Sequence, residues 1–154
     1  MAGTVAIGIQ QFNEIRKKGY FYIDKTAFIR EWWEKGDSVT LITRPRRFGK
    51  TLTMSMVEQF FSVKYAGQQN LFEGLAIWET KAYREIQGTY PVISLSFANL
   101  KEPSYELTRQ KVCDQLQQLY TEHAYILESG ILKGADKSFF ERMLHNEKVE
   151  YVDA

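Results

Sequence analysis

This 154-residue sequence has only one cysteine, no long apolar run and no large excess of charge of either sign. Its single cysteine, Cys113, excludes an intramolecular disulfide framework and a metal site built from several cysteines. No apolar run approaches the roughly 18–20 residues of a membrane helix, and the stretch 5–9 is too short for a signal peptide. The 20 basic and 19 acidic residues argue against a surface built throughout for nucleic acid. We therefore expect a cytoplasmic globular protein without membrane contact.

The composition is sufficient for a folded domain. Hydrophobic residues make up 44% of the chain and aromatic residues 14%, enough to build a core and to exclude disorder. The length suits one domain rather than two, and no internal repeat or Gly/Ser/Pro-rich linker divides the sequence.

Apolar residues at helical spacing predict several helices. Phe12 and Ile15 indicate a short helix that ends at Gly19, and residues 25–35 indicate a second that ends at Gly36. Further helices are expected directly after Lys50, over 79–86, from 104 onward and over 137–144. The helix after Lys50 carries Leu52, Met56, Val57, Phe60 and Phe61 on one face. The helix from 104 carries Tyr105, Val112, Leu116, Leu119, Tyr120 and His123 on one face.

Three stretches have the residue types and spacing of strands: 20–23, 38–43 and 90–97. In the last of them, Ile93, Leu95 and Phe97 alternate with serines. The order strand, helix, strand, helix predicts parallel strands joined by crossover helices, and hence the α/β class. A sheet usually has about five or six strands, so two or three predict an incomplete domain.

Residues 43–51, between the second expected strand and the next helix, carry the most chemical information. A phosphate-binding loop has the pattern G-x-x-x-x-G-K-[ST], in which backbone N–H groups surround phosphate, lysine contacts the β- and γ-phosphates and the hydroxyl ligates Mg²⁺. Gly49, Lys50 and Thr51 supply its second half at a helix start, where the dipole also favours an anion. Arg44 stands at the first glycine position and Pro45 favours an extended conformation there, so the loop is a variant one. The alternative to phosphate binding, a strand–turn–helix with a purely structural role, stays open.

Residues 44–51 resemble the variant P-loop of the AAA-ATPase-like family, predicted bacterial and archaeal P-loop ATPases that commonly carry a C-terminal PD-(D/E)XK-type nuclease domain. The similarity covers roughly residues 7–100, since it includes residues 7–9, Phe12, 22–26, 71–75 and 90–93. It implies that arginine at the first glycine position is normal in the family. It also implies a partial P-loop NTPase-like parallel sheet flanked by helices.

Two parts of the family pattern are absent from the sequence. No apolar run after the loop ends in Asp-Glu, the Walker B element that holds Mg²⁺ and polarises the attacking water, and no nuclease domain follows. Residues 20–24 belong to the N-terminal motif, and 149–153, with a charge in the middle, are interpreted as a tail. We therefore expect residues 1–154 to be the N-terminal part of the ATPase domain and to hydrolyse ATP poorly alone.

The resemblance implies a nucleotide site with ATP and Mg²⁺ as cofactors. Lys50 is expected to bind the β- and γ-phosphates and Thr51 to ligate Mg²⁺; the alternatives are a solvated lysine and a capping hydroxyl. Gly49 permits close approach of the backbone to phosphate. For Arg46 and Arg47 three alternatives have equal weight. They contact phosphate, they form a small basic patch for DNA, or they are solvated at the tip of the loop. The expected phosphate-binding set is Arg46, Arg47, Phe48, Gly49, Lys50 and Thr51.

Asp24, Lys25 and Thr26 match the N-terminal motif and are candidates for the base end of the nucleotide. Helix capping by Asp24 or Thr26 is an equal alternative. His123 and His145 have no partners at metal-ligand spacing.

Nucleotide binding is the preferred function, ahead of two alternatives. The first is a nucleic-acid-associated module that uses Arg44, Arg46 and Arg47. The second is an interaction fragment that forms a homo-oligomer through an unpaired strand edge and exposed apolar surface.

Overall fold

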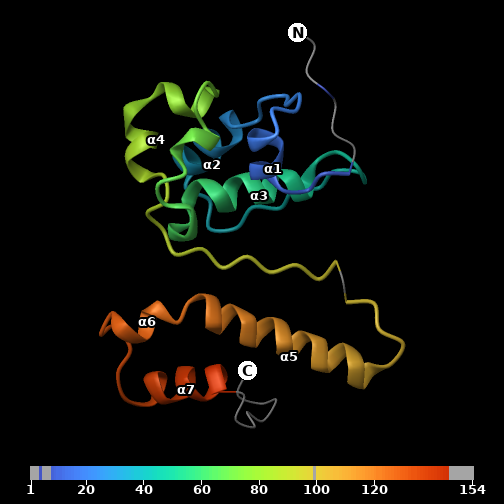
Figure 1. Cartoon of the computed structure of the whole chain (residues 1–154), viewed down its shortest axis with the longest axis vertical. Coiled ribbons are helices and arrows are strands. Elements are labelled where there is room, and N and C mark those ends of the chain that lie inside the picture. Colours follow the sequence, from blue (N-terminus) through green and yellow to red (C-terminus); the bar gives the residue numbers. More distant parts are fainter. Residues whose placement is uncertain (1–3, 5–7, 99, 146–154) are drawn as a thin grey trace. The chain divides into compact units, whose positions relative to one another are not determined.

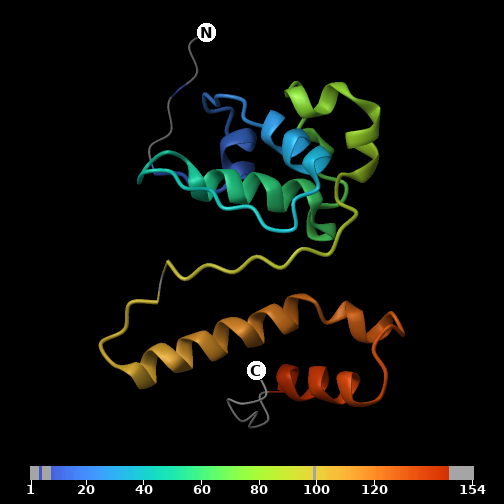
Figure 2. The same ribbon diagram turned by 180° about the vertical axis from the view of Figure 1, so that it is seen from behind.

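The computed structural model describes residue 4, residues 8–98 and residues 100–145. It divides into two compact units, Met1–Val92 and Ile93–Ala154. The helices of both units are shown in Figure 1 and, from behind, in Figure 2. Residues 149–153, interpreted from the sequence as a tail, lie outside the described residues.

The described residues of the first unit form four α-helices and three short 3₁₀ helices. The α-helices are α1 (Phe12–Lys17), α2 (Ala27–Lys35), α3 (Lys50–Phe61) and α4 (Lys81–Ile86); the 3₁₀ helices are η1 (Val63–Tyr65), η2 (Gln69–Leu71) and η3 (Ala76–Glu79). These confirm the helices predicted over this part of the chain. Helix α2 ends as predicted at Gly36, whose positive φ of 67° is accessible to glycine at little cost. Helix α1 packs against α3, as both views show.

An aromatic core holds α3 in place. Phe12, Phe60 and Phe72 are completely buried, and the Phe72 ring lies 5.1 Å from each of the other two. The predicted apolar face of α3 is confirmed, because Met56, Phe60 and Phe61 are buried and Leu52 and Val57 pack against the same core. Burial of one face anchors α3, and its first turn, with the loop before it, lies at the edge of this core.

The second unit contains α5 (Tyr105–Glu122), α6 (Tyr125–Glu128) and α7 (Gly134–His145). Helix α5 begins at the predicted place, and Ser104 is its N-cap, since the Ser104 hydroxyl accepts a hydrogen bond from the Leu107 N–H. Helix α5 packs against α7, where the rings of Tyr120 and Phe140 lie 4.9 Å apart. The placement of Tyr105 on the packed face is wrong, because its side chain is exposed.

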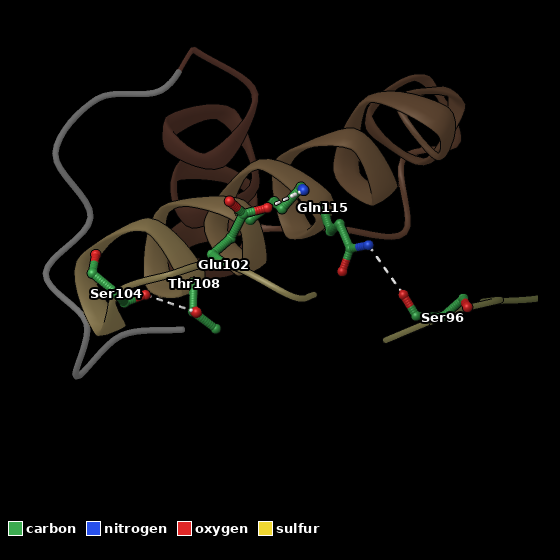
Figure 3. A network of polar contacts seen from close by, with 6 residues as sticks. Ser96, Glu102, Ser104, Thr108 and Gln115 are labelled. Carbon is green, nitrogen blue, oxygen red and sulfur yellow. Dashed lines mark hydrogen bonds and ion pairs between the residues drawn. The ribbon is translucent and has the colours of Figure 1, made fainter. Parts of the chain in front are cut away.

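Polar contacts join α5 to the chain segment that precedes it (Figure 3). Gln115 Nε2 donates to the Ser96 carbonyl oxygen at 3.0 Å, and Thr108 Oγ1 donates to the Ser104 carbonyl oxygen at 2.9 Å. Lys111 forms an ion pair with Glu102. These contacts hold Ser96, Glu102 and Ser104 against α5.

The predicted α/β class and its parallel sheet are wrong. Over the described residues the fold is all-α, and the single β contact is an isolated parallel bridge between Ser62 and Tyr90. The stretches 20–23, 38–43 and 91–97 are not helical, but none of them has a neighbouring strand there. A strand needs a partner for its backbone N–H and C=O groups, so composition and alternation alone do not produce one.

The exposure of the side chains in these stretches agrees with the absence of a sheet among the described residues. Val39, Leu41 and Ile93 expose 85%, 83% and 74% of their surface, so the apolar residues that suggested buried strands face solvent. Within the described part of the chain, no helix has the length and hydropathy needed to cross a membrane.

Candidate functional site

The loop over residues 44–49 leads directly into α3 and has an unusual backbone. Gly49 has a φ of 75° and Arg47 a φ of 71°, and Arg47 is the single non-glycine residue with positive φ among those described. A left-handed arginine is uncommon, and such conformations often occur at functional sites. The sequence places the conformational difficulty at Arg44, whereas the structure has it at Arg47.

The start of α3 has no acidic or capping side chain among the described residues. Gly49 is the N-cap residue, and the first turn contains no Asp or Glu. The alternative in which Thr51 acts as the cap is therefore not seen; its side chain is exposed. The N–H groups of the first turn have no partner within the helix, and together they carry partial positive charge.

Lys50 is folded back over the loop. Its Nζ donates to the carbonyl oxygens of Arg44 and Pro45, and the distance to Pro45 is 3.0 Å. The lysine is therefore not a solvated side chain that points away from the helix start. It holds its ammonium group inside the turn formed by residues 44–49.

A hollow of about 740 Å³ lies beside this loop. That volume is within the usual range of small-molecule sites, about 300–1,000 Å³. Of the expected phosphate-binding residues, all except Phe48 line it, and the Phe48 side chain is largely exposed. The lining residues are Gly8, Ile9, Gln10, Pro45, Arg46, Arg47, Gly49, Lys50, Thr51 and Leu52.

A polar cluster joins the start of α1 to α3, directly after residues 8–10, which line the hollow. The Phe12 N–H donates to Ser55 Oγ at 3.1 Å, and Ser55 Oγ donates to Gln11 Oε1 at 3.0 Å. Gln59 Nε2 donates to Ser55 Oγ at 2.9 Å, and Gln59 is completely buried. This cluster was not predicted from the sequence. Its signal was a serine and a glutamine four residues apart on α3, next to the apolar face.

Asp24 and Thr26 join the turn before α2 to η3. Asp24 Oδ1 accepts from the Thr26 N–H at 2.8 Å and from Thr26 Oγ1 at 2.7 Å, and Asp24 Oδ2 accepts from the Ala76 N–H at 2.8 Å. Thr26 Oγ1 in turn accepts from the Ile77 N–H at 3.1 Å. Burial alone would raise the pKa of Asp24, but these hydrogen bonds and the nearby Arg16 lower it below the usual aspartate value. Neither side chain lines the hollow.

Lys25, between these two residues, has a different environment. A Cβ atom at Gly49 would lie 3.3 Å from Lys25 Nζ, so the ammonium group lies beside the N-cap residue of α3. Within the described part of the chain, no group of three His, Cys, Asp or Glu side chains could hold a metal ion.

Comparison with known proteins identifies the family of this chain. The family described as Predicted AAA-ATPase matches residues 6–152, which is more of the chain than the motifs over 7–100 cover. An uncharacterised protein in the vnfD 5′ region of Azotobacter chroococcum mcd 1 is 38% identical over 92 residues, which are 59% of this chain and 16% of that protein. No solved structure matches. The family match spans nearly the whole sequence, and the chain therefore belongs to the predicted AAA-ATPase family.

Proposed function

We propose that this chain binds a nucleoside triphosphate, ATP with Mg²⁺, through residues 44–51 and the first turn of α3. The observation that carries the proposal is the position of Lys50. Its ammonium group lies inside the loop at the uncapped start of a 12-residue helix, beside a hollow of about 740 Å³.

The electrostatics of the loop support an anionic ligand. A cation at a helix N-terminus is disfavoured by about 0.3–1 kcal/mol at an exposed site, and the first turn of α3 offers Lys50 no acidic partner. A phosphate group would accept hydrogen bonds from the free N–H groups of this turn and from the lysine at once. Lys50 would exchange its two carbonyl acceptors for phosphate oxygens without leaving the loop.

Thr51 and the two arginines complete the proposed site. The Thr51 hydroxyl is exposed on the hollow one residue after Lys50, where it would ligate a Mg²⁺ ion bound to the phosphates. Arg46 and Arg47 are exposed on the loop and line the same hollow. Their guanidinium groups would add bidentate contacts to phosphate oxygens. The proposal concerns binding; hydrolysis needs a group that orients the attacking water.

Isothermal titration of the full chain with ATP and Mg²⁺ tests this function. Wild type is expected to show saturable binding that Lys50→Ala abolishes. Lys81→Ala is a matched control, because it removes the same charge from a side chain that pairs with Glu85 on α4 and is not part of the hollow. Absence of binding by wild type, or unchanged affinity in Lys50→Ala with an unchanged melting temperature, would refute the proposal.

Nucleic-acid binding is a second candidate, favoured by the exposure of the loop arginines. Arg44, Arg46 and Arg47 are all exposed, and none forms an ion pair with a residue that the structure describes. Binding through them should weaken steeply between about 50 and 200 mM salt, measured by the fluorescence anisotropy of a labelled DNA duplex. Anisotropy that does not change with protein concentration at low salt would exclude this candidate.

A further inference from the structure

We propose that Lys25 is a second cationic ligand of the nucleotide's phosphate chain. This inference rests on the proposed nucleotide site and adds to it a residue from outside the loop. It differs from the sequence-based expectation, which puts Lys25 at the base end of the nucleotide.

The position of the Lys25 ammonium group beside Gly49 is the starting point. Gly49 lines the hollow and immediately precedes Lys50, and Lys25 Nζ lies 3.3 Å from the Cβ position that Gly49 leaves vacant. Lys25 itself is not among the lining residues, so its ammonium group flanks the hollow at the helix start. The positive φ of 75° favours glycine at position 49, and a Cβ there would be slightly closer to the ammonium group than ordinary van der Waals contact.

The turn over residues 22–26 fixes the backbone of Lys25 from both sides. On the N-terminal side, Tyr22 Oη donates to Met56 Sδ of α3 at 3.2 Å and accepts from the Lys25 N–H at 3.3 Å. On the C-terminal side, Thr26 is completely buried and bonded to Asp24 and Ile77. The side chains on either side of Lys25 therefore anchor the turn to α3 and η3. Only the flexible side chain of Lys25 has to be ordered when a ligand binds, which keeps the entropic cost of binding small.

The charge distribution at the start of α3 favours an anion. Two ammonium groups, Lys25 and Lys50, lie at the positive end of α3, and the first turn contains no acidic residue. The carboxylate closest to Lys25 in the sequence, Asp24, is held by the N–H groups of Thr26 and Ala76. No described residue forms an ion pair with Lys25. Two lysines and a helix start match the several negative charges of a triphosphate.

Titrations of the full chain with Mg-ATP and with inorganic triphosphate, which has no base, test the inference. Lys25→Met removes the charge and keeps most of the stem, and should weaken binding of both ligands by about tenfold or more. Lys25→Arg keeps the charge and should retain most of the affinity. Lys81→Met, which changes the same charge on α4, should bind like wild type.

The outcomes separate this inference from the proposed function. Loss of binding in Lys50→Ala together with wild-type affinity in Lys25→Met would overturn the role of Lys25 alone. A Lys25→Met variant that loses affinity for ATP but not for triphosphate would also overturn that role, because the lysine would then act at the base end. Equal losses in Lys25→Met and Lys25→Arg, at unchanged melting temperature, would assign the effect to packing. Absence of ATP binding by wild type would overturn both proposals.

Discussion

Replacement of Thr26 by valine separates the contribution of hydrogen bonding to stability from that of packing, at the place where the 22–26 turn contacts η3. Thr26 is completely buried, its hydroxyl donates to Asp24 Oδ1 at 2.7 Å, and it accepts from the Ile77 N–H at 3.1 Å. Valine has nearly the same shape but can make neither bond. We expect Thr26→Val to destabilise the first unit even though it removes no apolar contact.

The magnitude follows from the two lost bonds. The Ile77 N–H would stay buried without an acceptor, which costs about 1–3 kcal/mol, and the bond to the Asp24 carboxylate adds about 1 kcal/mol because that carboxylate is exposed and recovers water. The expected loss is about 2–4 kcal/mol, a large part of a typical total of about 5–15 kcal/mol. Thr26→Ser keeps the hydroxyl and deletes one methyl group, at about 1 kcal/mol.

Urea unfolding followed by tryptophan fluorescence measures this difference. The three tryptophans, Trp32, Trp33 and Trp78, all belong to the first unit, so their emission reports on that unit alone. The midpoint of Thr26→Val should lie well below that of Thr26→Ser, which should lie slightly below wild type. A valine variant as stable as wild type, or a serine variant less stable than the valine variant, would refute the reasoning.

Three further predictions concern stability and ionisation. Gly88→Ala should cost clearly more than Gly67→Ala in urea unfolding: both glycines have positive φ, but a Cβ at Gly88 would lie 2.7 Å from Ala66 Cα whereas a Cβ at Gly67 meets nothing within 4 Å. Equal losses would contradict the close contact. The pKa of Asp24 is lowered in the folded state, so its contribution to stability is present above about pH 3.9 and is lost as the pH falls through the folded value. Asp24→Asn should flatten the acid side of a plot of urea midpoint against pH, and an unchanged slope would count against the hydrogen-bonded carboxylate. Burial raises the pKa of Tyr22 to about 12 from 10.0, so the unfolded chain loses this proton first and stability should fall between those two pH values. Burial also raises the pKa of Tyr83, so a spectrophotometric titration should show more than one late-ionising tyrosine, and Tyr22→Phe should remove the one that ionises near pH 12. An unchanged titration in the variant would assign that signal to another residue.

Features that depend on neighbouring residues along the chain could be predicted from the sequence. The C-terminal stop of α2 at Gly36 and the cap of α5 at Ser104 are local, because the residue type itself supplies the required φ or the required acceptor. The buried face of α3 also follows from spacing alone, since residues three and four positions apart share one side of a helix. The motifs that indicate the family are local as well, and the match over residues 6–152 confirms the family.

The sheet could not be decided in this way. Residues 38–43 and 90–97 have the composition of strands, yet a strand forms only where another chain segment offers its N–H and C=O groups in register. Among the described residues no such segment is present, and Val39, Leu41 and Ile93 remain exposed. Periodicity reports which side chains share a face; whether that face meets a partner is a tertiary property.

The candidate site also combines features that are local in the sequence with contacts that depend on the tertiary structure. The sequence by itself determined the loop, its lysine and the helix that follows, because all three are contiguous over residues 44–61. Only the tertiary structure decided that residues 8–10 line the hollow and that Asp24 and Thr26 hold η3. It alone also decided that the Lys25 ammonium group lies beside Gly49. These contacts join residues from about 24 to more than 50 positions apart, and their geometry depends on how the core around Phe12, Phe60 and Phe72 packs. No local pattern encodes that packing.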